Sequence, residues 1–392
     1  MAPLLAACFP GLQPGRGRLR SPLLPVPGLA RLMPPGGGSY FVKSDNDLQV
    51  SGSTHVRGAI YEVTLLAMVL GRKLGLMTDD AGPMALATAG ARRAFSAYKV
   101  VTASSGCLGL AAGRAAQGLG FRAEVHMPRS ARSWIERELR ASGIEVVLHD
   151  AGFRKANAAA RAATGDDPAS YFVDEKHSKL LFFGASAAAA ELQAQLARQN
   201  IQVDAERPLF LYLPCGSGSA PGGIALGARQ MFGPHVHCFF AEPVCTPRTL
   251  AALSSPRQGT VNVRDMGLRS RTAAAGLSVP ELSPLVAEAM ESQLSGVYTV
   301  EDDTMFRWLA QAQDQAGLQL DPGAASSLAG PEMLMQTEAG NAYLRRHGLA
   351  GKMDKAVHVM WATAGGCMPD ADYERCLMRG RMLQDSSRIA AE

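Results

Sequence analysis

The sequence lacks three features that would each indicate a class of protein. It has no Cys-x-x-Cys pair among its seven cysteines, no dense run of lysine and arginine beside aromatic residues, and no long apolar run. An odd number of scattered thiols in a long chain favours reduced cysteines and a cytoplasmic protein. With a formal net charge of only +4 and no basic run, we do not expect nucleic acid as a partner.

Membrane and export signals are missing as well. The apolar run AIYEVTLLAMVL is too short to span a bilayer, and it contains Glu62. At the N-terminus no basic segment precedes the apolar residues, and Pro10 and Pro14 interrupt the chain soon after them, so we do not expect a signal peptide. An organelle presequence is the alternative there. We therefore expect no membrane partner.

The chain does contain short β-branched or aromatic runs that alternate with alanine- and leucine-rich runs of helical spacing. The strand-like runs are SYFVKS, YKVVTAS, RAEVHMP, IEVVLHD, SYFVDE, PLFLYLP, HVHCFFAEP and AVHVMWAT. This alternation predicts βαβ units, and hence an α/β protein with mostly parallel sheets covered by helices. Residues 10–38 are rich in proline, glycine and arginine, so we expect them to be irregular.

Three predicted strand-to-helix loops carry candidate ligand-binding groups, because open α/β sheets bind ligands at the carboxyl ends of their strands. In TASSGCLGLAAG, the amides of a helix start and the hydroxyls of Ser104 and Ser105 would form an anion seat. In CGSGSAPGG, glycines precede a helix, which is typical of a phosphate loop and equally of a tight connection. In ATAGG, Thr363 offers one hydroxyl, which alone is more typical of a turn.

Together with the stretch VSGSTHVRG, these loops resemble one family, the pyridoxal-phosphate enzymes of the tryptophan-synthase β type, and among them the D-serine dehydratases. The similarity extends from about RSPLLPVPGL to RGRML, and its most specific stretches are SGS-x-x-x-RG-x-IYEV, GFRAEVHMP, YFVDEKHS, YLPCGSGSAPGG, GPHVHCFFAEP and VMWATAGG. The resemblance implies the fold-type II architecture, with two parallel or mostly parallel open sheets and flanking helices. It also implies the family reaction, a pyridoxal-phosphate-dependent elimination that converts D-serine to pyruvate and ammonia.

The resemblance places His55 where the family has its Schiff-base lysine, in a Ser-Gly-Ser-x-Lys motif. Imidazole has no primary amine, so the cofactor cannot be held covalently there, and the group that normally moves the substrate α-proton is also missing. Histidine can still act as a general base near neutral pH. We therefore expect non-covalent pyridoxal phosphate, if the cofactor binds, and an impaired or inactive enzyme.

Other family positions are implied by the same resemblance. They are Ser105 and Gly106 for the substrate carboxylate, Thr363 for the pyridine nitrogen, Asp174 near the active site, and Glu242 for a monovalent cation. Cys107 replaces an asparagine that supports the cofactor's phenolic oxygen, and a thiol is a weaker donor. The phosphate loop has Gly216, Ser217 and Gly218. Where the family continues with a run of glycines, this sequence has Ser219 and Ala220. We expect their β-carbons to clash with a positive φ or with a close phosphate.

Several alternatives stay open. Lys43, Lys176 or Lys179 could supply the missing amine, although a loop lysine is more typically solvated. Cys107 and His55 could form a cofactor-free nucleophilic site, or simply fill vacated space. We interpret the remaining histidines as structural because no third ligand accompanies the His-x-His pair on its predicted strand; they are His126, His235, His237 and His358.

A catalytically silent relative is the hypothesis that these observations favour. The alternatives are altered chemistry, with His55 as a base on non-covalent pyridoxal or pyridoxamine phosphate, and a non-catalytic ligand-binding relative. The resemblance further implies a small-molecule amino acid as ligand and a monomeric protein. We expect an irregular lead over residues 1–38, a large cofactor-binding domain over 39–85 and 190–392, and a small domain over 86–189.

Overall fold

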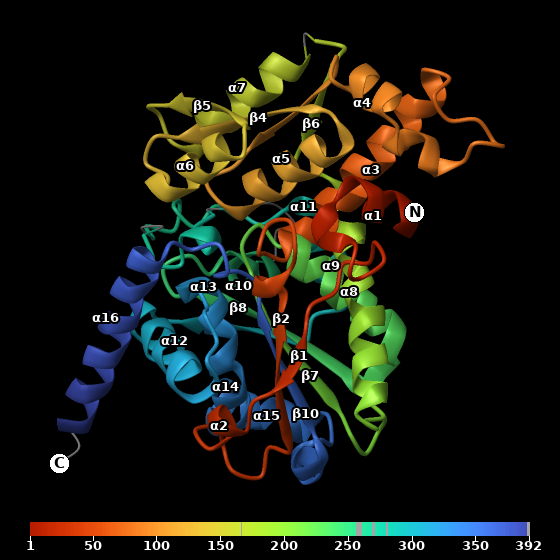
Figure 1. The fold of residues 1–392 in the computed structure, drawn as a ribbon. Coiled ribbons are helices and arrows are strands. Elements are labelled where there is room, and N and C mark those ends of the chain that lie inside the picture. Colours follow the sequence, from red (N-terminus) through yellow and green to blue (C-terminus); the bar gives the residue numbers. More distant parts are fainter. Residues whose placement is uncertain (166, 256–260, 269–270, 280, 390–392) are drawn as a thin grey trace. The chain divides into compact units, whose positions relative to one another are not determined.

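The computed structural model describes all residues except 166, 256–260, 269–270, 280 and 390–392. The chain forms two compact units (Figure 1). The first unit contains residues 1–20 and 48–184, and the second contains residues 21–47 and 185–392. These boundaries differ from the expected domain ranges, since residues 48–85 and the first part of the lead belong to the first unit.

The first unit contains a four-stranded sheet in the order β5-β4-β3-β6, in which every neighbouring pair is parallel. Its elements are α1 (Ala2–Cys8), η1 (Pro10–Leu12), α3 (His55–Lys73), η3 (Pro83–Ala87), α4 (Ala89–Phe95), β3 (Lys99–Ala103), α5 (Cys107–Leu119), β4 (Arg122–Pro128), α6 (Ser133–Ala141), β5 (Glu145–His149), α7 (Phe153–Gly165), β6 (Ser170–Val173) and the start of α8 (Lys179–Arg198).

Helices α5 and α7 cover opposite faces of this sheet. Val101 and Ala103 of β3 pack against Ala160 of α7, whereas Gly109 of α5 lies against Val125 of β4. Because side chains alternate along a strand, and Val125 pairs with Thr102, these contacts lie on the two different faces. Burial on both faces explains why the strands read as continuous apolar runs rather than as alternating ones.

The second unit contains a six-stranded sheet in the order β1-β2-β10-β7-β8-β9, parallel except for the β1-β2 pair. Its elements are β1 (Leu23–Pro25), α2 (Pro27–Ala30), β2 (Ser39–Ser44), η2 (Asp45–Asp47), the rest of α8, β7 (Leu209–Pro214), α9 (Ser219–Phe232), η4 (Gly233–His235), β8 (Val236–Pro243), α10 (Arg248–Ser254), η5 (Ala275–Leu277), α11 (Pro284–Met290), β9 (Gly296–Val300), α12 (Asp302–Ala316), α13 (Pro322–Ala325), η6 (Ser326–Ala329), α14 (Gly330–Gln336), α15 (Glu338–Arg346), η7 (Ala350–Lys355), β10 (Val357–Ala362) and α16 (Asp370–Ile389).

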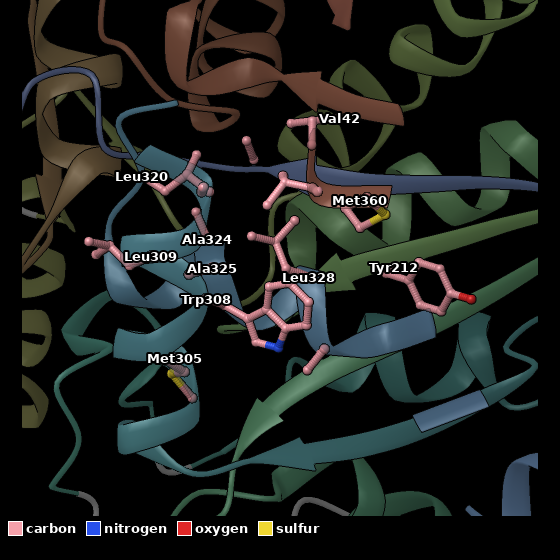
Figure 2. Close-up of a cluster of buried hydrophobic side chains, with 14 of the residues drawn as sticks. Val42, Tyr212, Met305, Trp308, Leu309, Leu320, Ala324, Ala325, Leu328 and Met360 are labelled. Atoms are coloured by element: carbon pink, nitrogen blue, oxygen red, sulfur yellow. The ribbon is translucent and has the colours of Figure 1, made fainter. Parts of the chain in front are cut away.

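The main core of the second unit lies between its sheet and the helices α12, α13 and η6 (Figure 2). Trp308 and Leu309 of α12 and Leu328 of η6 pack with Val42 of β2 and Met360 of β10. The sheet strands β7, β8 and β10 are buried along their whole length. The architecture confirms the predicted α/β class with two parallel or mostly parallel open sheets and flanking helices.

The N-terminal lead has more regular structure than its composition predicts. It contains α1, η1, β1 and α2, and Leu4 and Leu12 are buried. Phe9 packs so closely on Gly118 of α5 that a β-carbon at Gly118 would lie 2.0 Å from the Phe9 ring. The lead is therefore held by apolar contacts, which its proline and glycine content does not reveal.

Helix α8 is long and apolar enough to pass a length and composition test for a membrane span, with a mean hydropathy of 1.2 over its best window. In this structure 44% of that window is buried, so one side of α8 packs against the protein. Leu181, Phe182, Leu192 and Leu196 are buried, and Glu191 pairs with buried Lys43 within the second unit. We did not expect a helix of this length, because the apolar residues before Gly184 and the alanines after it form two separate runs in the sequence.

Candidate functional site

In the first unit, two of the predicted functional loops leave neighbouring strands. β3 and β6 pair in parallel with Thr102 opposite Val173, so residues 104–106 and residues 174–178 follow at the same edge of the sheet. Loops at the carboxyl edge of a parallel sheet are where α/β proteins place ligands. This edge carries four of the predicted site residues, namely Ser105, Gly106, Cys107 and Asp174.

The serine loop that opens α5 uses its two hydroxyls differently. The Ser104 hydroxyl accepts hydrogen bonds from the Gly106 and Gly109 amides, at 3.1 and 3.0 Å, and donates to the Gly106 carbonyl. It therefore supports the helix start and is not part of the expected anion seat. Ser105 is exposed, and the space where a β-carbon of Gly106 would stand is open. Cys107, the first residue of α5, is half-buried.

His55 is the first residue of α3, directly after the loop of residues 49–54. This loop contains an unusual positive φ of 80° at Val50, whose carbonyl accepts a hydrogen bond of 2.9 Å from Arg114. The His55 side chain is 29% exposed, and its Nε2 lies 3.5 Å from a carboxylate oxygen of Glu175. Its Nδ1 is buried and has no hydrogen-bond partner in the described part of the chain. A buried ring nitrogen of this kind is open to a ligand group.

Asp174 organises its own loop. Its carboxylate accepts hydrogen bonds from the Lys176 amide at 3.0 Å, from His177 Nδ1 at 2.9 Å and from Arg161. Burial alone would raise the pKa of Asp174, but the hydrogen bonds and charges of His177 and Arg161 lower it below the ordinary value. The acidic residue that faces His55 is Glu175, which directly follows Asp174 in the sequence. The sequence analysis did not predict this role for Glu175.

A second missed carboxylate, Glu62, lies on α3 two turns beyond His55. It is buried, and it accepts hydrogen bonds from the hydroxyls of Tyr171 at 2.9 Å and Ser178 at 2.6 Å. Burial raises the pKa of Glu62, and the two hydroxyls oppose that shift. These bonds attach α3 to the segments on either side of Asp174. The sequence does contain a feature that could have indicated this role for Glu62, because it is an acidic residue inside an otherwise apolar helical run.

In the second unit, three loops leave the adjacent parallel strands β10, β7 and β8 at one edge. The phosphate-loop candidate connects β7 to α9. Gly218 caps α9 with a φ of 92°, and a β-carbon there would lie 2.7 Å from Val286, so only glycine fits. The hydroxyl of Ser219, in the first turn of α9, is buried and has no partner among the described residues.

The backbone at Ser219 and Ala220 differs from the expectation. Both residues belong to α9, and neither has a positive φ. The predicted conflict between their β-carbons and a left-handed backbone is therefore wrong, because both residues already have helical backbone conformation. Gly216 and Ser217 complete the loop, and Ser217 is buried.

Two other predicted residues lie at this edge, Glu242 near the end of β8 and Thr363 directly after β10. Thr363 directly follows β10 and is half-buried. Glu242 is fully buried near the end of β8, and its carboxylate accepts hydrogen bonds from the Thr249 amide and hydroxyl at 2.9 Å and from the Leu250 amide at 3.2 Å. Burial raises the pKa of Glu242, while Arg248 and the donors of Thr249 and Leu250 oppose that shift. Its nearest cation is the guanidinium of Arg248, at 3.5 Å.

The lysines considered as replacements lie in different settings. Lys43 is fully buried in β2, and its ammonium donates to the Ser21 carbonyl at 2.7 Å, to the Ser21 hydroxyl and to Glu191 at 2.9 Å. An ammonium with three oxygen partners is fully satisfied. Lys176 is half-buried beside Glu175, and Lys179 is exposed at the start of α8.

The other histidines have structural surroundings. His237 bonds to the Tyr343 hydroxyl at 2.7 Å and His358 to the Tyr212 hydroxyl at 2.8 Å, and burial lowers their pKa values to about 4 and about 3. His126 contacts Glu124 and His149. His235 ends η4, so its predicted place on the same strand as His237 is wrong. No group of three His, Cys, Asp or Glu in the described ranges could hold a metal ion.

Comparison with known proteins gives consistent results. A family model described as pyridoxal-phosphate dependent enzyme matches residues 16–342. A probable D-serine dehydratase of Sinorhizobium medicae is 44% identical over 380 residues, which cover 96% of this chain and 86% of that protein. A probable D-serine dehydratase of Acidovorax ebreus is 45% identical over 387 residues, 97% of this chain and 86% of that protein.

Solved structures show the same fold at low sequence identity. Diaminopropionate ammonia lyase from Escherichia coli, in complex with an aminoacrylate-PLP azomethine intermediate, matches with a TM-score of 0.72 and 18% identity, covering 97% of this chain and 92% of that one. Maize serine racemase matches with a TM-score of 0.68 and 16% identity, covering 98% and 100%.

Replacing Gly218 by alanine should destabilise the second unit by roughly 2–4 kcal/mol, since left-handed backbone strain adds to a close contact with Val286. Gly233→Ala is a matched control, because Gly233 has a φ of 61° with open space around it and suffers the backbone strain alone. Urea denaturation of both variants measures the difference. Equal losses would show that the contact with Val286 does not matter.

Asp174→Asn should cost about 1–3 kcal/mol near neutral pH, the usual range for hydrogen bonds to a charged group. A carboxyl with a lowered native pKa stabilises the fold above its unfolded pKa, and this stability is lost as the pH falls through the native pKa. The variant should therefore lose less stability than the wild type between about pH 5 and pH 2. Urea denaturation at several pH values tests this, with Asp150→Asn, whose side chain is 87% exposed, as control. Parallel pH curves for Asp174→Asn and wild type would contradict it.

Proposed function

Because this chain belongs to the pyridoxal-phosphate-dependent enzymes, in the family of the D-serine dehydratases, we propose that it binds pyridoxal phosphate without a covalent bond and has impaired or no dehydratase activity. The family reaction converts D-serine to pyruvate and ammonia. The observation that carries this proposal is the imidazole of His55 at the start of α3, the residue at which the family resemblance implies the Schiff-base lysine. An imidazole cannot form the imine that a primary amine forms.

The phosphate end of the cofactor fits the residues present. The amides of Ser219 and Ala220 open α9, where an N–H has no partner within the helix, and the buried hydroxyl of Ser219 has none in the described residues, so these groups are available to phosphate oxygens. Gly216 and Gly218 add no side chains to the loop. These residues would hold the phosphate. When bound, the cofactor supplies an electron sink for negative charge on a substrate carbon.

The aldehyde end does not fit a covalent attachment. His55 has no amine, and Lys43 holds Ser21 and Glu191 from a fully buried position. Moving Lys43 out of this cluster would separate it from the half-buried Glu191 carboxylate and from the Ser21 oxygens, which is unfavourable. Lys176 lies on the loop next to Glu175, and Lys179 is the first residue of α8. The dehydratase reaction is therefore limited by the lack of an amine for the cofactor's aldehyde, and not by the lack of a phosphate-binding loop.

A second function is favoured by the contact between His55 and Glu175. A carboxylate 3.5 Å from Nε2 can orient the imidazole. The partnerless Nδ1 is then the atom that would take or hold a proton. In this alternative, His55 is a base acting on an amino acid beside non-covalent pyridoxal or pyridoxamine phosphate. A non-catalytic ligand-binding relative would use the same loops without proton transfer.

We further propose a monomeric, cytoplasmic protein whose ligand is a small amino acid, as the scattered thiols and the resemblance imply. Burial raises the pKa values of the Cys215 and Cys238 thiols to about 12, and neither cysteine belongs to a disulfide. We do not include the monovalent cation implied at Glu242, because that carboxylate already faces the Arg248 guanidinium.

Pyridoxal phosphate added to the purified protein should bind reversibly and leave no label after borohydride reduction, because no lysine replaces the tether. Intact-mass analysis and peptide mapping measure this. The His55→Lys variant should gain a reducible linkage at residue 55 and D-serine-dependent pyruvate formation, at least about 100-fold above wild type. His55→Gln is the matched control. Stoichiometric labelling of the wild type at Lys176 or Lys179, with pyruvate formation, would refute the proposal.

The general-base alternative predicts exchange of the D-serine α-proton with solvent in the presence of cofactor, which NMR in D₂O detects. His55→Gln should abolish this exchange, whereas Glu175→Gln should reduce it, since the imidazole loses the carboxylate that orients it. Binding without any exchange would remove the alternative and leave the ligand-binding relative.

A further inference from the structure

The guanidinium of Arg248 lies inside a ring of oxygen atoms. Nε donates to the Gly216 carbonyl at 2.7 Å, and Nη1 donates to the Leu277 and Val279 carbonyls at 2.6 and 2.7 Å. Nη2 donates to the Cys215 carbonyl, and a Glu242 oxygen lies 3.5 Å from Nε. The Arg248 side chain is 0% exposed. All these residues belong to the second unit.

Such an environment is unusual for arginine but ordinary for a small metal cation. Burying a single positive charge is costly unless oxygens replace its water shell. Here four carbonyl dipoles and one carboxylate surround the charge, the ligand types that bind hard cations in proteins. Glu242 has a fixed geometry in this ring, because the Thr249 and Leu250 amides hold both of its oxygens.

We propose that the Arg248 guanidinium is the resident cation of this site, so that the protein neither binds nor needs a free alkali cation at Glu242. The side chain supplies the same charge to the same kind of oxygen ring. Because it is covalently attached, it loses no translational freedom on binding and cannot be exchanged with solvent ions. The resemblance implies a monovalent cation at this position, and the residues present do not fit one.

Arg248 is also a positioning residue for the phosphate loop, a role that rests on the proposed function. It holds the carbonyls of Cys215 and Gly216, the two residues before Ser217. In a trans peptide the carbonyl and the following N–H point in opposite directions. The amides of Gly216 and Ser217 therefore point away from Arg248. The clamp thus fixes the amide directions of the loop without touching a ligand.

Thermal unfolding in different salts tests the resident-cation proposal. Purified wild type should have the same Tm, within about 1 °C, in KCl, NaCl and tetramethylammonium chloride at equal ionic strength, because no ion binds. Arg248→Met should lose roughly 5 °C or more in tetramethylammonium chloride, since Glu242 is left buried without its cation. KCl should restore part of this loss. Arg379→Met, which removes an exposed ion pair with Asp303, is the control and should show little change.

Thallium NMR gives a direct reading of cation binding, because Tl⁺ is a substitute for K⁺. Wild type should show no saturable Tl⁺ binding, whereas Arg248→Met should show one saturable site that Arg248→Met/Glu242→Gln lacks. Saturable binding to wild type that Glu242→Gln abolishes, or a wild-type Tm that rises with KCl alone, would overturn the proposal. If Arg248→Met does not fold, these wild-type measurements decide the question by themselves.

The affinity for pyridoxal phosphate separates this inference from the proposed function. Wild-type affinity should be the same in all three salts, and Arg248→Met should weaken it at least about tenfold in tetramethylammonium chloride, a loss of about 1.4 kcal/mol. Failure of the wild type to bind the cofactor would defeat the proposed function, while the Tm and Tl⁺ measurements would still test the resident cation. Unchanged affinity in a folded Arg248→Met would overturn the positioning role.

Discussion

Parallel strand pairing within each sheet is the constraint on which every candidate functional group depends. When neighbouring strands run in the same direction, the loops that follow them emerge at one edge, so residues distant in the sequence become neighbours. In the first unit this places the loop before Cys107 beside the loop that starts at Asp174. In the second unit it places the phosphate loop, which follows β7, between the end of β8 with Glu242 and the end of β10 before Thr363. A site in either unit follows from topology before any side chain is considered.

Buried charges in the second unit are satisfied locally, and this limits what each can do. Lys43 is held by Ser21 and Glu191, while Arg248 is held by carbonyls and Glu242. In each case the partners replace water around the charge, so removing one member leaves the other exposed to a low-dielectric interior. A buried lysine with this environment cannot also serve as a mobile reactive amine. The two cations therefore have architectural roles in the second unit.

His55 shows how a reactive position can change while its surroundings stay suited to a ligand. The loop before α3 still turns sharply, with a positive φ at Val50 and at Gly52, and the helix still begins at residue 55. The imidazole has a carboxylate neighbour and one buried nitrogen without a partner in the described residues. The family resemblance implies a change of chemistry at this residue, because an imidazole cannot form the imine that a primary amine forms, whereas it can exchange a proton.

The sequence by itself determined the α/β class, most of the strands and the resemblance to the pyridoxal-phosphate-dependent family, because strand and helix periodicities are local and a motif is read residue by residue. It did not reveal β1, because this strand has only three residues and lies in a proline-rich segment. It also did not reveal β9, a strand with mostly half-buried side chains that pairs with β8 at the edge of the sheet. Only the tertiary structure decided that Ser104 supports a helix start, that Glu175 rather than Asp174 faces His55, and that Arg248 fills a ring of carbonyls. The physical reason is that backbone oxygens are the same in every residue, so the folded chain alone determines where they converge.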